Sequence, residues 1–370
     1  MRLNTDVSRR ISMLRPLLII GVVYVHVAGV SDLPSELAPG IFNWFAAFFK
    51  NGVFRGTVPT MSLIAGFLLF SSGLDRQPGK LFKKKFVTLL VPFIIFNLYC
   101  FGFMELVNLM FGQVFPTLAT WHETAGRTAE FIFGVTTYPI NGPLHFVRDM
   151  MVAIAMVPLL SFMLRTLPWI GFIASAIFFG MDYDGLLIFR ASSLLLFYVG
   201  GAAAIYKWNL LALDQFAKEC LGIFVVVCLI IIGFKIDDNT VLVTVAPFLI
   251  WPAASLLKGS RLEKWAIGFC KYSFFIFVAH MPIIGTMWWY MMHHARWIPY
   301  PVFWFAAPAL TVLILKMTYD FAISVAPTAF NFAIGSRANK PAFADRRLQP
   351  RASNAPVYSD EARLGLAARS

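Results

Sequence analysis

An arginine and a histidine lie at the two ends of the first long apolar stretch of the chain, LRPLLIIGVVYVH. Arg15 and His26 are eleven residues apart. In an α-helix this spacing ends about 20° beyond three full turns, so both side chains would share one face, roughly 16 Å apart along the axis. A charge at the centre of a bilayer costs about 2.5–3.5 kcal/mol, which makes such residues candidates for function. The pair could line a shaft through the protein. The alternative is an arginine that snorkels to the surface and a histidine hydrogen-bonded within the helix bundle.

A second group of ionisable residues lies in the segment NGPLHFVRDM. His145, Arg148 and Asp149 stand at positions i, i+3 and i+4, so a helix would place them on one face. Arg148 and Asp149 could also form a purely structural ion pair. Two further arginines, Arg55 and Arg190, are expected at a similar depth. Several arginines around one histidine favour the binding of an anion.

The remaining intramembrane polar residues have simpler interpretations. His280 lies in the middle of the segment KYSFFIFVAHMP, and Lys316 and Asp320 are spaced to pair with each other. The four cysteines form no CxxC pair, so we expect them to pack as small apolar residues and we expect no bound metal. They are Cys100, Cys220, Cys228 and Cys270.

The elements that position these residues must be membrane helices. The 370 residues are 59% hydrophobic and 14% charged, whereas soluble domains have roughly 45–50% apolar and about 25% charged residues. Irregular backbone is not viable in lipid, so the sequence predicts an all-α integral membrane protein. About ten transmembrane helices are predicted, at residues 11–30, 53–71, 86–111, 144–164, 167–181, 186–206, 219–234, 240–257, 267–291 and 301–325.

Lysines and arginines are concentrated in every second connection and after the last predicted helix. Cytoplasmic segments are enriched in these residues, so both termini are predicted to be cytoplasmic. The net charge of +12 is then a signal of topology, and no nucleic-acid partner is expected. Residues 1–330 are predicted to form one transmembrane domain, and residues 331–370 a polar, basic cytoplasmic tail without fixed structure.

Several stretches resemble, in order, motifs of the acyltransferase-3 family, the integral membrane O-acyltransferases that decorate bacterial polysaccharides. They are the Arg15–His26 spacing, PTMSLIAGFLLF, KKKFVTLLVPF, NGPLHFVRDM and YSFFIFVAHMPII. The resemblance covers about residues 8–325. Within the family, the chain looks most similar to exopolysaccharide succinyltransferases of the succinoglycan type.

The resemblance implies an enzyme of the bacterial inner membrane without a permanently bound cofactor. It would move an acyl group, succinyl favoured and acetyl next, from cytosolic acyl-CoA to a hydroxyl of an exopolysaccharide or its lipid-linked precursor. The bilayer and polysaccharide-assembly proteins are further expected partners. A transporter or flippase for an anionic substrate is the alternative, because it would also use intramembrane arginine and histidine.

Roles for individual residues follow from this interpretation. His26 is expected to act as the general base, since the ordinary pKa of histidine lies near 6.5; a covalent acyl-histidine is the less favoured alternative. Arg15 is the second catalytic candidate and would lie along the path of the donor. Supporting roles are expected for His145, Asp149, His280 and Arg55. Basic residues would bind the donor. Arg148 or Arg190 would bind the succinyl carboxylate. Four basic residues at the surface would bind the CoA phosphates, namely Arg76, Lys83, Lys84 and Lys85.

Overall fold

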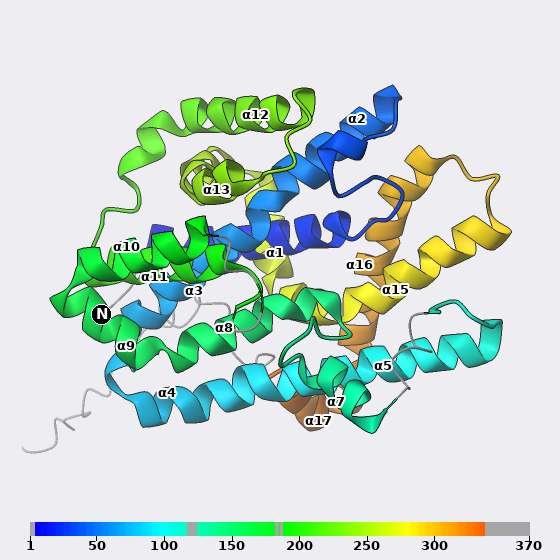
Figure 1. Cartoon of the computed structure of the whole chain (residues 1–370), viewed down its shortest axis with the longest axis horizontal. Coiled ribbons are helices and arrows are strands. Elements are labelled where there is room, and N and C mark those ends of the chain that lie inside the picture. The colour runs from blue at the N-terminus through cyan, green and yellow to red at the C-terminus, as the bar shows by residue number, and fades with distance from the viewer. Residues whose placement is uncertain (1–3, 117–123, 182–184, 186–187, 337–370) are drawn as a thin grey trace, which may run out of the picture.

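The computed structural model describes residues 4–116, 124–181, 185 and 188–336, and over these residues regular structure is entirely helical (Figure 1). Every predicted span coincides with helix over most of its length. The longer helices are α1 (Thr5–Val25), α3 (Thr57–Ser71), α5 (Val91–Phe111), α8 (His145–Ala155), α9 (Val157–Thr166), α10 (Pro168–Gly180), α11 (Ala191–Ile205), α12 (Ala217–Gly233), α13 (Thr240–Ala253), α14 (Arg261–Phe269), α15 (Ser273–His294) and α16 (Tyr300–Val325). The shorter ones are α2 (Ile41–Ala47), α4 (Pro78–Lys85), α7 (Ala125–Phe133) and α17 (Pro327–Ala333).

Within the described residues, six helical segments are long and apolar enough to cross a membrane. They are Ile41–Ser71, Pro78–Phe111, Ala212–Gly233, Thr240–Leu257, Arg261–His294 and Tyr300–Val325. Helices α8 and α9 would together make a seventh, although they bend by 59°. Helices α10 and α11 have 13 and 15 residues, fewer than the roughly 20 that span a bilayer. The chain is thus a multi-pass membrane protein, while the count of about ten crossings and the orientation of the termini stay predictions.

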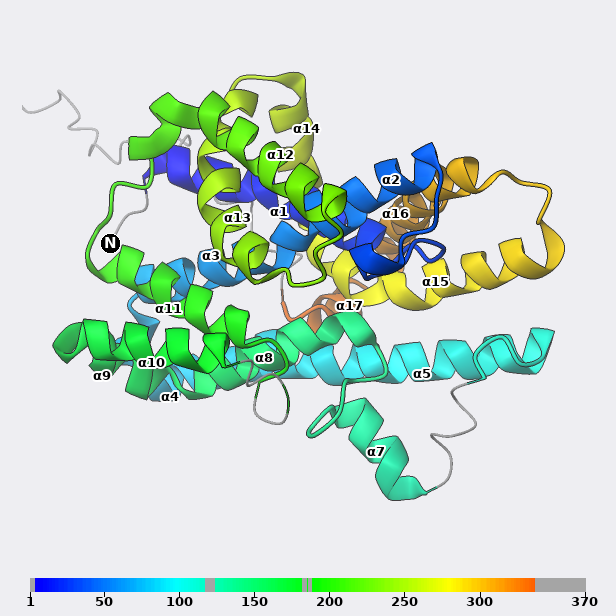
Figure 2. The ribbon, with the colours of Figure 1, turned by 45° about the horizontal axis from the view of Figure 1, so that its top comes forward.

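Helix α1 runs through the middle of the molecule and packs against α3, α14 and α15 (Figures 1 and 2). Two ion pairs join the first turns of α1 to other segments of the chain. Arg9 pairs with Glu263 at 2.6 Å, and Arg10 pairs with Asp214 at 2.5 Å. The helix begins at Thr5 and ends at Val25, whereas the sequence predicted a span over 11–30. His26 is therefore the C-terminal cap of the helix, where the chain turns into a loop.

Helices α3 and α11 cross at very close range, and two glycines make this contact possible. A Cβ on Gly66 would lie 2.0 Å from the carbonyl oxygen of Phe197, and one on Gly200 would lie 2.1 Å from that of Leu63. No side chain fits such gaps, so the two backbones touch directly, as small residues allow in membrane helix pairs. The glycine of the PTMSLIAGFLLF motif thus has a packing role.

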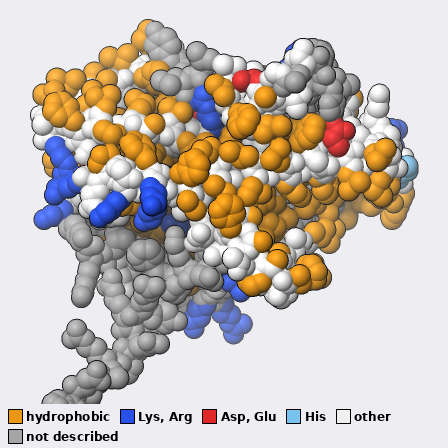
Figure 3. Space-filling view, turned by 90° about the horizontal axis from the view of Figure 1, so that it is seen from below, with side chains coloured by type: hydrophobic (Ala, Val, Ile, Leu, Met, Phe, Trp, Pro, Cys, Tyr) orange, Lys and Arg blue, Asp and Glu red, His pale blue; other side chains and the backbone are white. Residues whose placement is uncertain are grey.

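The outer surface has the apolar character of a membrane protein. Large hydrophobic side chains such as Leu109 and Trp169 are 85% and 75% exposed. Figure 3 shows the face over α4 and α5, where apolar side chains dominate and basic ones gather towards the end at which α4 lies. Water disfavours so much exposed apolar area, whereas lipid accommodates it. Of the predicted tail, residues 331–370, those from 337 on lie outside the described residues, whereas 331–333 end helix α17.

Candidate active site

The side chain of His26 meets that of His280 at the end of α1. The rings lie edge to face with centroids 5.1 Å apart, and Nε2 of His280 is 3.4 Å from Nδ1 of His26. His280 is fully buried within α15, whereas His26 is partly exposed. The structure thus brings together two histidines that the sequence placed 254 residues apart.

The surrounding carbonyls determine which ring nitrogen of each histidine carries hydrogen. Nδ1 of His280 faces the carbonyls of Ile276 at 3.1 Å and Phe277 at 2.9 Å. A carbonyl only accepts, so this Nδ1 donates and the Nε2 of a neutral ring is left as an acceptor. Nδ1 of His26 faces the Val22 carbonyl at 2.8 Å as well as that acceptor, so it also donates. The neutral His26 ring therefore has its lone pair on Nε2, the arrangement that a general base needs.

Arg15 lies on the same side of α1 as His26, as the spacing predicted. Its guanidinium interacts with the side chain of Cys270, and His26 meets His280 further along the same helical segment, Arg261–His294. Because these two contacts follow the same order along α1 and along the segment Arg261–His294, the two segments run parallel. Arg15 is exposed, so its guanidinium is accessible to a ligand.

Asp149 holds the start of α11 in place. Its carboxylate accepts hydrogen bonds from the backbone N–H groups of Phe189 and Arg190, each at 2.9 Å. A carboxylate at a helix N-terminus is favourable because it meets unpaired N–H groups and the positive end of the dipole. Asp149 thereby fixes the position from which the exposed Arg190 side chain projects.

Arg148 is largely committed to structural contacts. Its guanidinium donates to the carbonyls of Gly134 at 3.2 Å and Val135 at 2.7 Å, and it lies 3.4 Å from Asp149. It also stacks over the ring of Phe189, 4.2 Å from the centroid. Because the side chain is buried and its donors face protein acceptors, this arginine fastens the connection after α7 to α8.

His145 and two arginines extend the site around His26. His145 donates from Nδ1 to the Gly142 carbonyl at 2.8 Å, and it lies within electrostatic range of both His26 and Arg190. Arg55 lies within range of Arg190 and pairs with Asp32 at 3.3 Å. The structure therefore gathers His26, His145, Arg55 and Arg190 from four separate segments, as the sequence predicted from their depth.

Two groups of polar residues in this region were not predicted. Asn141 donates to the carbonyls of Phe96 at 3.2 Å and Val278 at 2.7 Å, and its backbone N–H donates to Asn97. This buried network joins α5, α15 and the NGPL turn next to His280. The other group is formed by Lys50 and Asn51, which hold the loop after His26. Both residues lie between the predicted spans 11–30 and 53–71, in a connection on the outer side of the membrane, so the sequence did not predict that they are buried.

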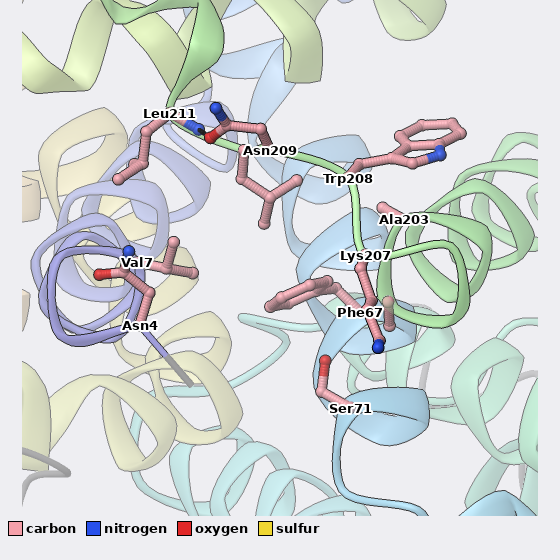
Figure 4. A pocket seen from close by; sticks show the side chains of 11 residues that line it. Asn4, Val7, Phe67, Ser71, Ala203, Lys207, Trp208, Asn209 and Leu211 are labelled. Atoms are coloured by element: carbon pink, nitrogen blue, oxygen red, sulfur yellow. Dashed lines mark hydrogen bonds between the residues drawn. The ribbon is translucent and has the colours of Figure 1, made fainter. Parts of the chain in front are cut away.

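The predicted phosphate-binding residues lie on and beside α4. Arg76, Lys83 and Lys84 are exposed and Lys85 is half-buried. A cavity of about 160 Å³ lies at the N-terminal end of α1, between α3 and the connection after α11 (Figure 4). Val7, Phe67 and Lys207 are among its lining residues. This cavity is at the opposite end of α1 from His26, so it is not the place where the histidine pair would act.

Comparison with known proteins identifies the family of the chain. Residues 9–315 match the acyltransferase domain that defines the acyltransferase-3 family, so the chain belongs to this family of membrane acyltransferases. It is similar to the succinoglycan biosynthesis protein ExoH of Rhizobium meliloti (strain 1021), with 29% identity over 352 residues. The alignment covers 90% of this chain and 94% of that protein. No solved structure matches the chain.

Proposed function

We propose that this protein transfers a succinyl group from succinyl-CoA to a hydroxyl of a bacterial exopolysaccharide or its lipid-linked precursor, with acetyl as the next candidate. The observation that carries the proposal is the His26–His280 pair, in which the lone pair of His26 is on Nε2. Membership of the acyltransferase-3 family supports acyl transfer. The similarity to a succinoglycan biosynthesis protein supports a polysaccharide acceptor.

In the proposed reaction, the acceptor hydroxyl lies against Nε2 of His26. The hydroxyl oxygen attacks the thioester carbonyl carbon while its proton passes to Nε2, which gives a tetrahedral oxyanion. The carbon–sulfur bond then breaks, and His26 returns the proton to the leaving thiolate. The imidazolium that forms transiently is stabilised through Nδ1, which donates to the Val22 carbonyl and to His280. A nearby arginine would stabilise the oxyanion.

The donor would approach from the Arg15 end of α1. About 16 Å separate residues 15 and 26 along the helix axis, which suits the pantetheine arm of CoA. The exposed basic residues on and beside α4 would bind the CoA phosphates. With both termini in the cytoplasm of an inner-membrane protein, this end of α1 would face cytosolic acyl-CoA.

Arg190 is the better candidate for the succinyl carboxylate. It is exposed near His145, whereas Arg148 is buried against carbonyls and the Phe189 ring. A carboxylate in a poorly solvated site needs a cationic partner, and Arg55 adds a second positive charge nearby. An acetyl donor has no carboxylate for Arg190 to bind.

The proposal is tested with purified protein in detergent, acyl-CoA and unacylated exopolysaccharide from a deletion strain of the source bacterium. Succinyl- and acetyl-CoA are supplied side by side, and mass spectrometry measures the acyl group on the saccharide. Transfer with a preference for succinyl supports the proposal. Binding of saccharide without consumption of either donor would instead favour a transporter or flippase.

A further inference from the structure

The ammonium group of Lys50 is buried beside the loop that follows His26. Lys50 lies in the π-helical turn Phe48–Gly52 between α2 and α3, and its side chain is almost completely enclosed, with the residue 4% exposed. Its Nζ donates to the carbonyl oxygens of Val27 at 3.2 Å and Val30 at 2.8 Å. These carbonyls belong to the first residues after His26.

The contacts of Lys50 use all of its hydrogen-bonding capacity. An ammonium group has three donors and no acceptor. Two donors are directed at the two carbonyls, and the third side of the group faces the carboxylate of Asp32 at 3.3 Å. Removing an ammonium from water is costly unless such partners compensate it. Lys50 therefore has no donor left for a substrate.

The neighbouring side chain holds the same loop. Asn51 Nδ2 donates to the Ser31 carbonyl at 3.0 Å, and Asn51 is 3% exposed. The five-residue hydrogen-bond spacing of a π turn places successive side chains differently from an α-helix, and such turns recur at functional sites. Here it directs both Lys50 and Asn51 at the loop. Together these two residues form a clamp on residues 27–31.

We propose that the clamp of Lys50 and Asn51 positions His26 for catalysis; this rests on the function proposed above. His26 is the cap residue of α1, so only one side of it is held by helix. The other side is held by the clamp, through the Val27 carbonyl. The Lys50 charge also lies within electrostatic range of His26. Asp32 pairs with both Lys50 and Arg55, and Arg190 lies within electrostatic range of Arg55.

The primary test compares Lys50→Met and Lys50→Arg with the wild type and with Lys258→Met, a control at an exposed lysine. Lys50→Met should lower kcat by about 10²-fold, because a misplaced catalytic group costs about this much. The KM for the donor should stay within about two-fold, because Lys50 does not contact it. Lys50→Arg keeps the positive charge and has N–H donors for the Val27 and Val30 carbonyls, so it should recover at least about ten-fold of the loss. Folded Lys50→Met with wild-type kcat, or a loss that lies in KM, would overturn the proposal.

Asn51→Ala provides a test that does not disturb the buried charge. It removes only the contact with the Ser31 carbonyl, and it should lower kcat by about ten-fold with an unchanged donor KM. If Lys50→Met does not fold, Asn51→Ala alone tests the proposal. A wild-type kcat of Asn51→Ala would then reject the role of the clamp. A wild-type protein without acyl transfer would reject the proposed function, whereas an active wild type with fully active variants rejects only the clamp.

Discussion

His280 Nε2 lies 3.4 Å from His26 Nδ1, and this contact leaves the lone pair of His26 on the opposite ring nitrogen. The arrangement is similar to that of a catalytic triad, in which a second group fixes the tautomer of the histidine base and stabilises the imidazolium that it forms. Here backbone carbonyls and a buried imidazole take the place of a carboxylate. A neutral partner avoids a buried negative charge next to an anionic donor.

The orienting role of His280 predicts a specific loss in the His280→Phe variant. The variant keeps an aromatic side chain but removes one of the two acceptors of His26 Nδ1 and leaves only the Val22 carbonyl, so kcat should fall by about ten-fold with little change in KM. The exposed His293 at the end of the same helix offers a matched control, and His293→Phe should keep wild-type kcat. Equal activity of His280→Phe and His293→Phe would remove His280 from the mechanism.

The proposed role of Arg190 predicts a change in donor preference. Arg190→Gln should lower kcat/KM for succinyl-CoA by about ten-fold, since a hydrogen bond to a charged group contributes about 1.5–3 kcal/mol. Transfer from acetyl-CoA should change by less than about three-fold, because acetyl has no carboxylate. Arg296→Gln, at an exposed position, is the control. A parallel loss with both donors would assign Arg190 a general role in structure or catalysis.

The proposed donor path can be probed with a native cysteine. Cys270 interacts with Arg15 and is partly accessible, whereas Cys100, Cys220 and Cys228 are buried. A thiol-reactive probe should therefore label Cys270 first, and saturating succinyl-CoA, whose thioester leaves no free thiol to consume the probe, should slow this labelling by about ten-fold if the pantetheine arm passes Arg15. Cys270→Ser should abolish the rapid phase. Labelling at the same rate with and without succinyl-CoA would place the donor elsewhere.

Residue spacing was sufficient to predict the placement of several site residues. Arg15 within α1 and His26 at its C-terminal cap lie on the same side of the helix, because the helical period determines their relation. The i, i+4 pair of Lys316 and Asp320 is present at 2.8 Å for the same reason. The distribution of basic residues among the connections predicted that His26, His145 and Arg190 lie at one depth. The structure brings these three residues together. Such local rules also predicted the all-helical class.

Contacts between distant segments could not be predicted from spacing. Nothing in the sequence shows that Lys50 is buried, because its role depends on a π turn and on carbonyls of a separate loop. Arg148 appeared equivalent to Arg190, yet tertiary packing directs it at Gly134 and Val135. Helix lengths were also uncertain: α1 ends at Val25 because the chain turns at His26, a change that hydrophobicity does not register.

The close crossing of α3 and α11 predicts that Gly66→Ala destabilises the protein. The added methyl would lie 2.0 Å from a carbonyl oxygen, so the helices must separate; overpacking of this kind costs about 1–3 kcal/mol. Thermal unfolding in detergent should show a lower midpoint. Gly102→Ala is the matched control, since a Cβ there meets nothing within 4 Å. Equal midpoints for the two variants would contradict the tight crossing.

The most direct test of the central claim is the initial rate of succinyl transfer by the folded His26→Gln variant. Glutamine is similar in size to histidine but cannot accept the proton of a hydroxyl, so the rate should fall by about 10²–10⁴-fold. The KM for succinyl-CoA and the unfolding midpoint should match those of the wild type. A His26→Gln protein that transfers succinyl at the wild-type rate would contradict the role of His26 as the general base.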